Sequence, residues 1–326
     1  MDHDPTYKQI ETEMMREKGD YEMTVNRGGC ILTSLSVQLF MTFALLCLPG
    51  VTYALSTFGI LSPISQKGNS FDDITFSTAD TMYAVDSSRN QILIFGADDQ
   101  IARKISCAMP TAIAVSDSVL YVGSSKDLSV VMMDLSGQVI GHLGDGAHEF
   151  KLPRNIAIDR QTNDIYVVDQ LDDSIKVYTN EGSFLRRIGD SGNLPQDVTI
   201  VGDEIFVLDQ PLLTDAYGDQ VRGAMVSVFD MTGTLVRRFG AYGTTEGEFV
   251  RPKAITSNSL GDIFIADAFN GTVLCFDQEG NFLHTIHDQT TSMIGSMGLA
   301  IDQTGRLMVA TSQAGQLSVF LIDSTL

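Results

Sequence analysis

The sequence predicts an all-β fold made of a repeated four-stranded sheet. Residues 239–286 contain four short apolar runs, rich in Ile, Val and Phe, which are separated by Gly261, Asn270-Gly271 and Glu279-Gly280. Short runs of this composition, with Gly, Asn and Asp between them, are typical of antiparallel strands joined by tight turns. One such sheet cannot bury both of its faces alone, so we expect it to pack against other sheets.

The same pattern recurs along the chain. It begins at Phe71, Pro110, Pro153, Pro195, Pro252 and Ser296. The spacing is about 40 to 45 residues, a period at which several strands per repeat indicate a β-propeller. Only the fourth repeat is longer, because residues 211–224 interrupt it. We therefore predict a six-bladed β-propeller of four-stranded blades over residues 55–326.

The fifth repeat resembles the pattern of the NHL-repeat family. The matching residues are Gly240, Gly243, Phe249, Pro252, the run Ile265-Ala266-Asp267 and the run Phe276-Asp277-Gln278-Glu279-Gly280. The third repeat is similar, and the resemblance extends over roughly residues 51–326. It departs from the family pattern at Phe71 and Ser296, where Pro is expected, and at Gly123 and Thr311, where Asp is expected. The resemblance implies the fold and little about the activity, because propellers host many unrelated functions.

Composition limits the class of partner. The net charge is −20 and the pI is near 4.4. A field of this sign repels phosphate backbones. Family members that bind RNA do so through basic faces, and this sequence has no basic run. We therefore expect the protein not to bind nucleic acid. We also expect the propeller to be monomeric.

The N-terminal region predicts export. Residues 1–29 are polar and charged and are expected to be a disordered tail, whereas residues 30–54 carry no charge and are expected to form a hydrophobic helix. This helix is either a signal peptide cleaved after Ala54, with Met23 as a possible alternative start, or an uncleaved membrane anchor. Arg27 precedes the apolar segment, so the positive-inside rule puts the propeller outside the cytoplasm, as a secreted, periplasmic or membrane-anchored protein.

The last repeat contains only three predicted strands. We expect residues 53–59 to supply its outer strand, because their pattern matches residues 234–240 of the fourth repeat. This pairing would join the two ends of the chain and remove an exposed sheet edge.

The mouth of the central channel is the predicted binding face. Residues just after the repeat starts are expected to line it, among them Arg154, Gln196 and Lys253. These three are the predicted binding residues for a protein or small-molecule ligand. In an alternative interpretation, Asp73, Asn155 and Asp197 hold a divalent cation such as Ca²⁺, as acids and Asn do in lactonase-type propellers, although no Glu completes the set. A third interpretation is a polar, water-filled channel without a ligand.

The insertion at residues 211–224 is expected on the same face. Leu212, Leu213, Tyr217 and Arg222 combine apolar side chains with a cation, which suits contact with a partner. A tolerated surface insertion is the alternative.

The remaining Asp, His and Cys residues give little support to an active site. Asp86, Asp169, Asp209 and Asp267 each end a second strand, where Asp commonly accepts hydrogen bonds from backbone amides of a turn. The peptidyl-amidoglycolate lyase is a related propeller that uses His-bound zinc, but of His142, His148, His284 and His287 only His148 is expected near the channel. Cys107 and Cys275 fall in blades that are not neighbours, so no disulfide is expected.

These patterns predict a binding or scaffold protein, more readily than an enzyme. The alternative is a hydrolase or lyase, similar to lactonases or to the amidoglycolate lyase, with a cation at the channel mouth.

Overall fold

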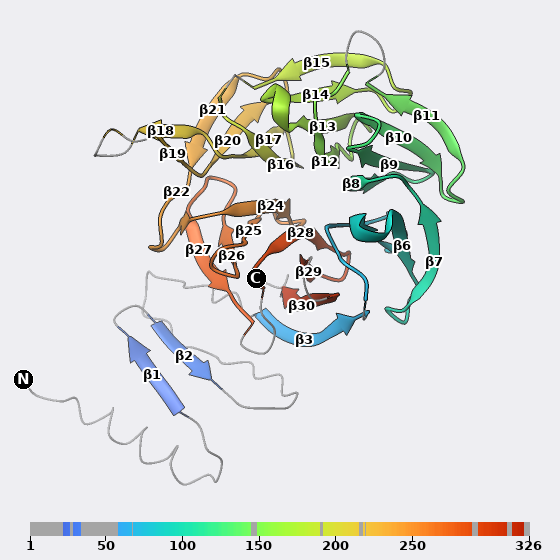
Figure 1. Cartoon of the computed structure of the whole chain (residues 1–326). Coiled ribbons are helices and arrows are strands. Elements are labelled where there is room, and N and C mark those ends of the chain that lie inside the picture. Colours follow the sequence, from blue (N-terminus) through green and yellow to red (C-terminus); the bar gives the residue numbers. More distant parts are fainter. Residues whose placement is uncertain are drawn as a thin grey trace, which may run out of the picture. The chain divides into compact units, whose positions relative to one another are not determined.

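The computed structural model describes residues 22–26, 29–33, 58–66, 68–144, 149–189, 192–214, 218, 220–288, 293–311 and 315–322. The chain divides into two compact units, Met1–Tyr53 and Ala54–Leu326. In the second unit, six four-stranded antiparallel sheets are arranged in a ring about a central axis, as Figure 1 shows. The predicted six-bladed propeller is confirmed.

The blades follow the chain in order. Blades 1 and 2 contain β4 (Asp73–Phe76), β5 (Met82–Asp86), β6 (Gln91–Phe95), β7 (Ile101–Ser106), β8 (Pro110–Val115), β9 (Val119–Ser124), β10 (Ser129–Asp134) and β11 (Val139–Leu143). Blades 3 and 4 contain β12 (Pro153–Ile158), β13 (Ile165–Asp169), β14 (Ser174–Tyr178), β15 (Phe184–Ile188), β16 (Pro195–Val201), β17 (Glu204–Asp209), β20 (Met225–Asp230) and β21 (Leu235–Phe239). Blades 5 and 6 contain β24 (Pro252–Ser257), β25 (Ile263–Asp267), β26 (Thr272–Phe276), β27 (Phe282–Ile286), β28 (Ser296–Ile301), β29 (Arg306–Thr311), β30 (Gln316–Ile322) and β3 (Phe58–Ser65).

The loops between the blade strands contain short 3-10 helices and short strand pairs. They are the 3-10 helices η1 (Ser87–Arg89) and η3 (Gln170–Asp172), the hairpin β18 (Leu212–Thr214) with β19 (Gln220–Arg222), and the parallel pair β22 (Ala241–Tyr242) with β23 (Glu248–Phe249).

The repeat positions predict the inner strands closely. Five of them begin at the predicted residue, and the first begins at Asp73 instead of Phe71. One position needs correction in blade 2: Ser124, not Gly123, pairs with Pro110, as Asp169 pairs with Pro153 in blade 3. The error arose because nothing in the sequence of the second blade marks the end of its second strand.

The core lies between adjacent blades. Val168 and Ile175 of blade 3, for example, share one buried cluster with Val198 and Val207 of blade 4. Every blade therefore depends on its two neighbours for burial of both faces, and burial of apolar area is the main stabilising contribution.

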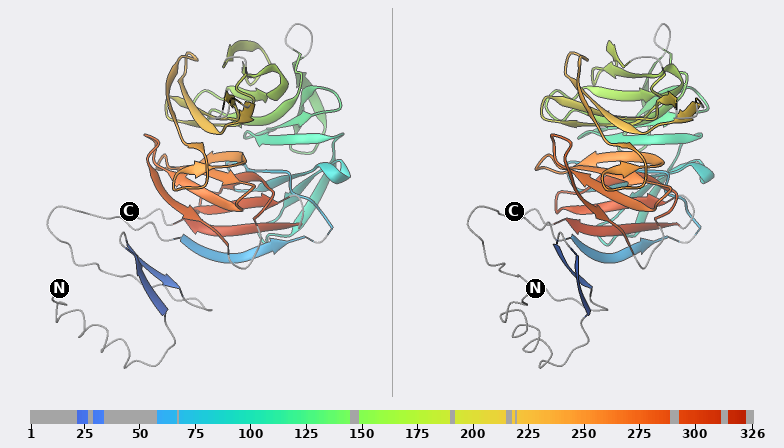
Figure 2. Two further views of the ribbon diagram at one scale, coloured as in Figure 1. Left: turned by 60° about the vertical axis from the view of Figure 1, so that its left-hand side comes forward. Right: turned by 90° about the vertical axis from the view of Figure 1, so that its left-hand side faces the viewer.

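The ring closes through the strand that comes first in the propeller. β3 pairs with β30, with Phe58 opposite Ile322 and Ser65 opposite Gln316, and the two strands lie side by side in Figure 2. The predicted closure is confirmed: the closing strand is Phe58–Ser65, which shares Phe58 and Gly59 with the predicted residues 53–59, and residues 53–57 lie outside the described residues. The register is irregular between Leu61 and Ile64, where Pro63 lies, as is typical of bulges in edge strands.

The two faces of the propeller are distinct. In each blade the loops before the inner strand, and between the second and third strands, lie at the end of the sheet that holds Asp73, Val85 and Asp86 in blade 1. We call this side the channel-mouth face. Phe58 and Ile322 pair at the opposite end of blade 6, so the chain enters and leaves the propeller on the opposite face.

The N-terminal unit contains an antiparallel hairpin of β1 (Glu22–Asn26) and β2 (Gly29–Thr33). The predicted helix over residues 30–54 is not supported at its start, because Gly29–Thr33 form β2, and its remainder lies outside the described residues. Most of the predicted tail over residues 1–29 also lies outside them. No helix in the described residues is long and apolar enough to cross a membrane.

Candidate binding site at the channel mouth

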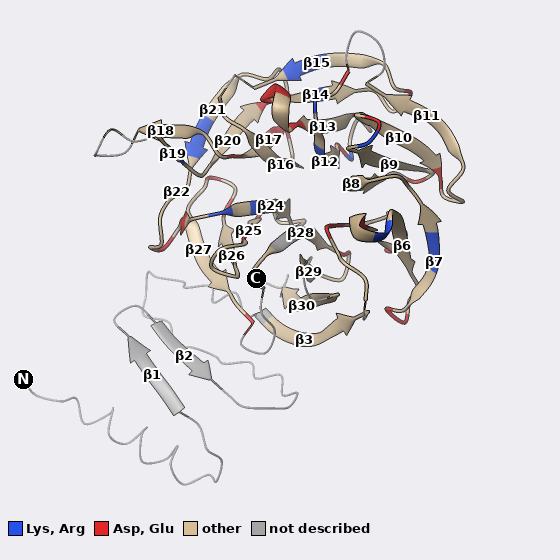
Figure 3. Cartoon of the chain, in the orientation of Figure 1, with Lys and Arg blue, Asp and Glu red and all other residues tan. Residues whose placement is uncertain are grey.

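Three predicted binding residues occupy equivalent positions on successive inner strands. Arg154, Gln196 and Lys253 are the second residues of β12, β16 and β24. Lys253 Nζ donates to Gln196 Oε1 at 3.1 Å, and Gln196 Nε2 donates to the Leu194 carbonyl at 2.9 Å. We call Arg154, Gln196 and Lys253 the cationic arc. Figure 3 shows basic residues on β12 and β24 beside the channel.

The positive charges of this arc lack ion-pair partners. Burial, together with the nearby cations Arg154 and Arg251, lowers the pKa of Lys253 to about 8. Within the described part of the chain, neither Arg154 nor Lys253 forms an ion pair with a carboxylate. The arc is therefore a partly desolvated group of like charges in a protein whose net charge is −20.

The predicted cation ligands Asp73 and Asp197 are buried and already hydrogen-bonded. Asp73 accepts the backbone N–H groups of Ile74 at 2.9 Å and of Ile113, in the next blade, at 2.8 Å. Asp197 makes the same two contacts, with Val198 at 2.6 Å and with Ile255 at 2.8 Å. These carboxyl groups thus connect blade 1 to blade 2 and blade 4 to blade 5.

Burial dominates the electrostatics of both groups. It raises the pKa of Asp73 to about 7 and that of Asp197 well above its ordinary value, against the opposing effect of Arg154. Asn155, the third member of the predicted calcium site, lies half-buried at the matching position of β12. The described residues contain no group of three or more His, Cys, Asp or Glu side chains that could hold a metal ion. The geometry thus gives these carboxyl groups a structural task that competes with the calcium site of the alternative interpretation.

The row of Asp residues at the ends of the second strands behaves largely as predicted. Asp169 accepts the backbone N–H groups of Lys151 and Leu152. Asp267 accepts those of Val250 and Arg251. Each carboxylate thereby fixes the loop that leads into the inner strand of its own blade.

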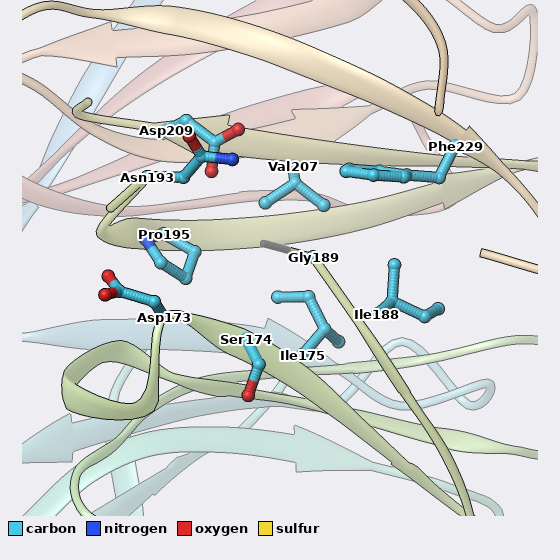
Figure 4. Close-up of a pocket in the computed structure, with 10 residues that line it drawn as sticks. All are labelled: Asp173, Ser174, Ile175, Ile188, Gly189, Asn193, Pro195, Val207, Asp209 and Phe229. Atoms are coloured by element: carbon cyan, nitrogen blue, oxygen red, sulfur yellow. The ribbon is translucent and has the colours of Figure 1, made fainter. Parts of the chain in front are cut away.

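Asp209 in blade 4 is the exception. Asp173 of blade 3 accepts the N–H groups of Gly192 and Leu194, at 3.0 and 2.9 Å, in the loop before β16. Asp209 is buried, its Oδ2 atom has no hydrogen-bond partner among the described residues, and burial raises its pKa to about 7. It borders a cavity of about 10 Å³ between blades 3 and 4, shown in Figure 4 with Asn193 beside Asp209. A cavity of this size accommodates about one water molecule.

The insertion in blade 4 forms the hairpin β18–β19 and one wall of a groove. The groove has a volume of about 200 Å³ and is lined by Gln170, Leu171, Asp173, Gly192, Leu194, Leu212 and Arg222. Leu171 on η3 is 59% exposed and Leu212 is 51% exposed. Arg222 Nη1 donates to the Gln210 carbonyl at 3.2 Å. Leu212 and Arg222 were among the predicted contact residues, whereas Tyr217 lies outside the described residues.

The remaining candidates that the structure describes lie away from the inner strands. His142 lies on β11 and His284 on β27, both outer strands, and His148 lies outside the described residues. Cys107 and Cys275 are buried free thiols, and burial raises both of their pKa values, so neither is an activated nucleophile.

Sequence comparison finds partial relatives. No family model matches the chain. A segment of 153 residues, 44% of this chain, is 28% identical to Protein brain tumor of Drosophila melanogaster, of which it covers 13%. A segment of 45 residues, 14% of this chain, is 42% identical to B-box type zinc finger protein ncl-1 of Caenorhabditis elegans, of which it covers 5%. The chain thus matches only a small part of these curated relatives.

Structure comparison supports the architecture. A gluconolactonase from Xanthomonas campestris aligns with a TM-score of 0.61 at 15% identity, over 80% of this chain and 88% of that one. A streptogramin B lyase aligns with a TM-score of 0.58 at 14% identity, over 82% and 98%. At these identities the likeness shows the fold alone.

The fold and the channel mouth define a six-bladed β-propeller scaffold. The repeat pattern resembles that of the NHL-repeat β-propellers, and the partial curated matches are consistent with this resemblance.

Proposed function

We propose that this propeller is an exported or membrane-tethered binding module that holds a protein partner on its channel-mouth face. One observation carries the proposal: large apolar side chains that are exposed outside the blade strands lie almost entirely on this face. Among the described residues, those on the channel-mouth face are Met109, Leu128, Leu171, Leu212, Leu213, Tyr242, Phe269 and Ile294, and the one on the opposite face is Leu260. Exposed apolar residues concentrated on one face are typical of an interaction surface.

Backbone strain on the same face supports the proposal. Met109, Leu128 and Leu194 have φ angles of 43°, 48° and 47°. A bulky residue in the left-handed region costs roughly 1–2 kcal/mol. Hydrogen bonds from the Met109 N–H to Asn90 Oδ1 and from the Leu194 N–H to Asp173 Oδ1 hold two of these residues in place. Retained strain of this kind is concentrated at functional sites.

The path of the chain is compatible with a tether. Phe58 and Ile322 lie on the face opposite the channel mouth. An anchor that precedes Phe58 would therefore leave the channel-mouth face accessible to a partner. Export itself is inferred from the uncharged residues 30–54 after Arg27.

Replacement of the hairpin tests the proposal. Residues 212–222 are exchanged for a Gly-Asn turn, which leaves the buried Pro211 and Ala224 in place, and the full-length protein is cross-linked and recovered from membrane fractions. We expect the melting temperature to stay nearly unchanged, because a surface hairpin contributes little to the core, and recovery of the specific partner to be lost. Unchanged recovery would place the binding surface elsewhere.

The location is tested separately by protease protection. An epitope after Leu326 should be digested when protease is added to intact cells or spheroplasts. Digestion only after lysis would contradict export.

A further inference from the structure

The positive charges of the cationic arc are not used in the proposed contact with an apolar surface. Arg154 and Lys253 lie on blades 3 and 5, on either side of Gln196 in blade 4, and Arg251 lies two residues before Lys253. The Lys253 ammonium and the Gln196 amide are held by the chain of hydrogen bonds that ends on the Leu194 carbonyl. The Lys253 and Gln196 side chains are thus ordered by contacts that do not involve a carboxylate.

The charged groups around the arc are few. The carboxyl groups of Asp73 and Asp197 interact with Arg154, and both use their oxygens to accept backbone N–H groups. Asp72 at the equivalent position of blade 1 accepts the N–H of Ser87 at 2.9 Å. None of these groups forms an ion pair with the arc, so its donors remain available to a ligand at the channel mouth.

Like charges that lie close together without an ion-paired carboxylate favour an anion. A guanidinium presents a planar fork that suits carboxylate and phosphate oxygens, and an ammonium supplies a second, compact charge. Gln196 between them can orient the bound group through its amide. We propose that the cationic arc is a binding site for a single anionic group, a carboxylate or a phosphate, which enters the channel mouth between Arg154 and Lys253. This proposal rests on the proposed function, since it names the chemistry that this face recognises.

The anion could be a free small molecule or part of a partner. Two probes separate these sources: inorganic phosphate, and a triglutamate peptide with triglutamine as its neutral counterpart. The full-length protein is titrated with each probe by calorimetry at pH 6.5 and constant ionic strength. We expect saturable binding of phosphate if the ligand is small, of triglutamate if the anion is peptide-borne, and no binding of triglutamine.

Charge variants assign any binding to the arc. Arg154→Gln with Lys253→Gln should weaken binding by about tenfold or more, as expected when charge-assisted hydrogen bonds are lost. Arg103→Gln with Lys104→Gln removes the same charge from the outer strand β7 and should leave the affinity unchanged. Arg154→Lys keeps the charge without the fork and should fall between the two. Circular dichroism and melting curves establish that each variant is folded.

Three results would overturn the proposal: no saturable binding of either probe, equal affinity in the wild type and the arc variant, or equal loss in the β7 control. These results differ from failure of the proposed function, which is tested with uncharged variants of the apolar residues. If those variants lose partner binding and neither probe binds, the channel-mouth face is the binding face but does not contain an anion site.

Discussion

Asp73 accepts the backbone N–H of Ile113 at 2.8 Å and so joins the inner strands of blades 1 and 2. Asp197 repeats the arrangement with Ile255 between blades 4 and 5. The inner strands have only one neighbour within their own sheets, so their other edge needs acceptors from elsewhere. These two carboxyl groups provide them, and we regard them as connections that hold the ring together.

Removal of either carboxyl group should therefore destabilise the propeller. Asp73→Ala or Asp197→Ala leaves buried N–H groups without acceptors, which costs about 1–3 kcal/mol for each group. Asn155→Ala, at the matching position of blade 3, is the control and should cost no more than about 0.5 kcal/mol. Urea denaturation at pH 6 measures the difference. Equal free energies of unfolding for the Asp73→Ala and Asn155→Ala variants would contradict the structural task.

Asp209 should make stability depend on pH. Its pKa in the folded state is about 7, above the ordinary value of 3.8, so the folded protein binds more protons than the unfolded chain between these values. Its stabilising contribution is present below the unfolded pKa and is lost as the pH rises through 7. A shift of this size corresponds to at most roughly 4 kcal/mol.

The Asp209→Asn variant isolates this effect. The wild type should lose more free energy of unfolding between pH 5 and pH 8 than the variant does. Comparison at each pH cancels the contributions of other groups, such as Asp73, Asp197 and His284. Parallel pH profiles for the two proteins would show that Asp209 does not titrate in this range.

Loss of the closing strand should weaken the ring. A chain that begins at Gly68 lacks β3, so β30 becomes an exposed edge and the cluster that contains Ile64, Leu317 and Val319 loses a member. We expect this chain to aggregate or to melt well below a chain that begins at Val51. Equal melting temperatures would refute the importance of the closure.

Calcium should not bind at the channel mouth. The Asp73 and Asp197 oxygens accept backbone N–H groups, and their raised pKa values oppose the ionised form that calcium requires. Calorimetric titration with calcium to millimolar concentration should therefore give no saturable signal. A stoichiometric site that disappears in Asp197→Ala would instead support the alternative of a hydrolase or lyase.

The features that repeat could be predicted from the sequence, and those that depend on contacts between blades could not. Pro153, Pro195 and Pro252 recur at one position, which is why the starts of the inner strands were predicted correctly. The closing strand occurs once and contains an irregular register near Pro63, so its continuation from Ile60 to Ser65 was not predicted.

The candidate site shows the same division. Arg154, Gln196 and Lys253 were predicted together because they share one repeat position. The groove was missed because Leu171 and Leu212 come from different blades and meet only across the interface between them. Likewise, Asp173 of blade 3 accepts N–H groups of the loop before β16, and Asp209 Oδ2 has no hydrogen-bond partner among the described residues. This arrangement depends on the geometry between blades 3 and 4. The αL conformation of Leu194 also has no signal in the sequence.

The most direct test of the account compares the two faces of the propeller. The full-length protein, a Leu171→Ser/Leu212→Ser variant of the channel-mouth face and a Leu260→Ser variant of the opposite face are cross-linked in membrane fractions, and the amount of the specific partner recovered with each is quantified. All three residues are exposed, so the variants should remain folded with similar melting temperatures. We predict that the Leu171→Ser/Leu212→Ser variant loses most of the recovered partner while Leu260→Ser retains it. Equal recovery with both variants, or loss only with Leu260→Ser, would contradict the assignment of the binding function to the channel-mouth face.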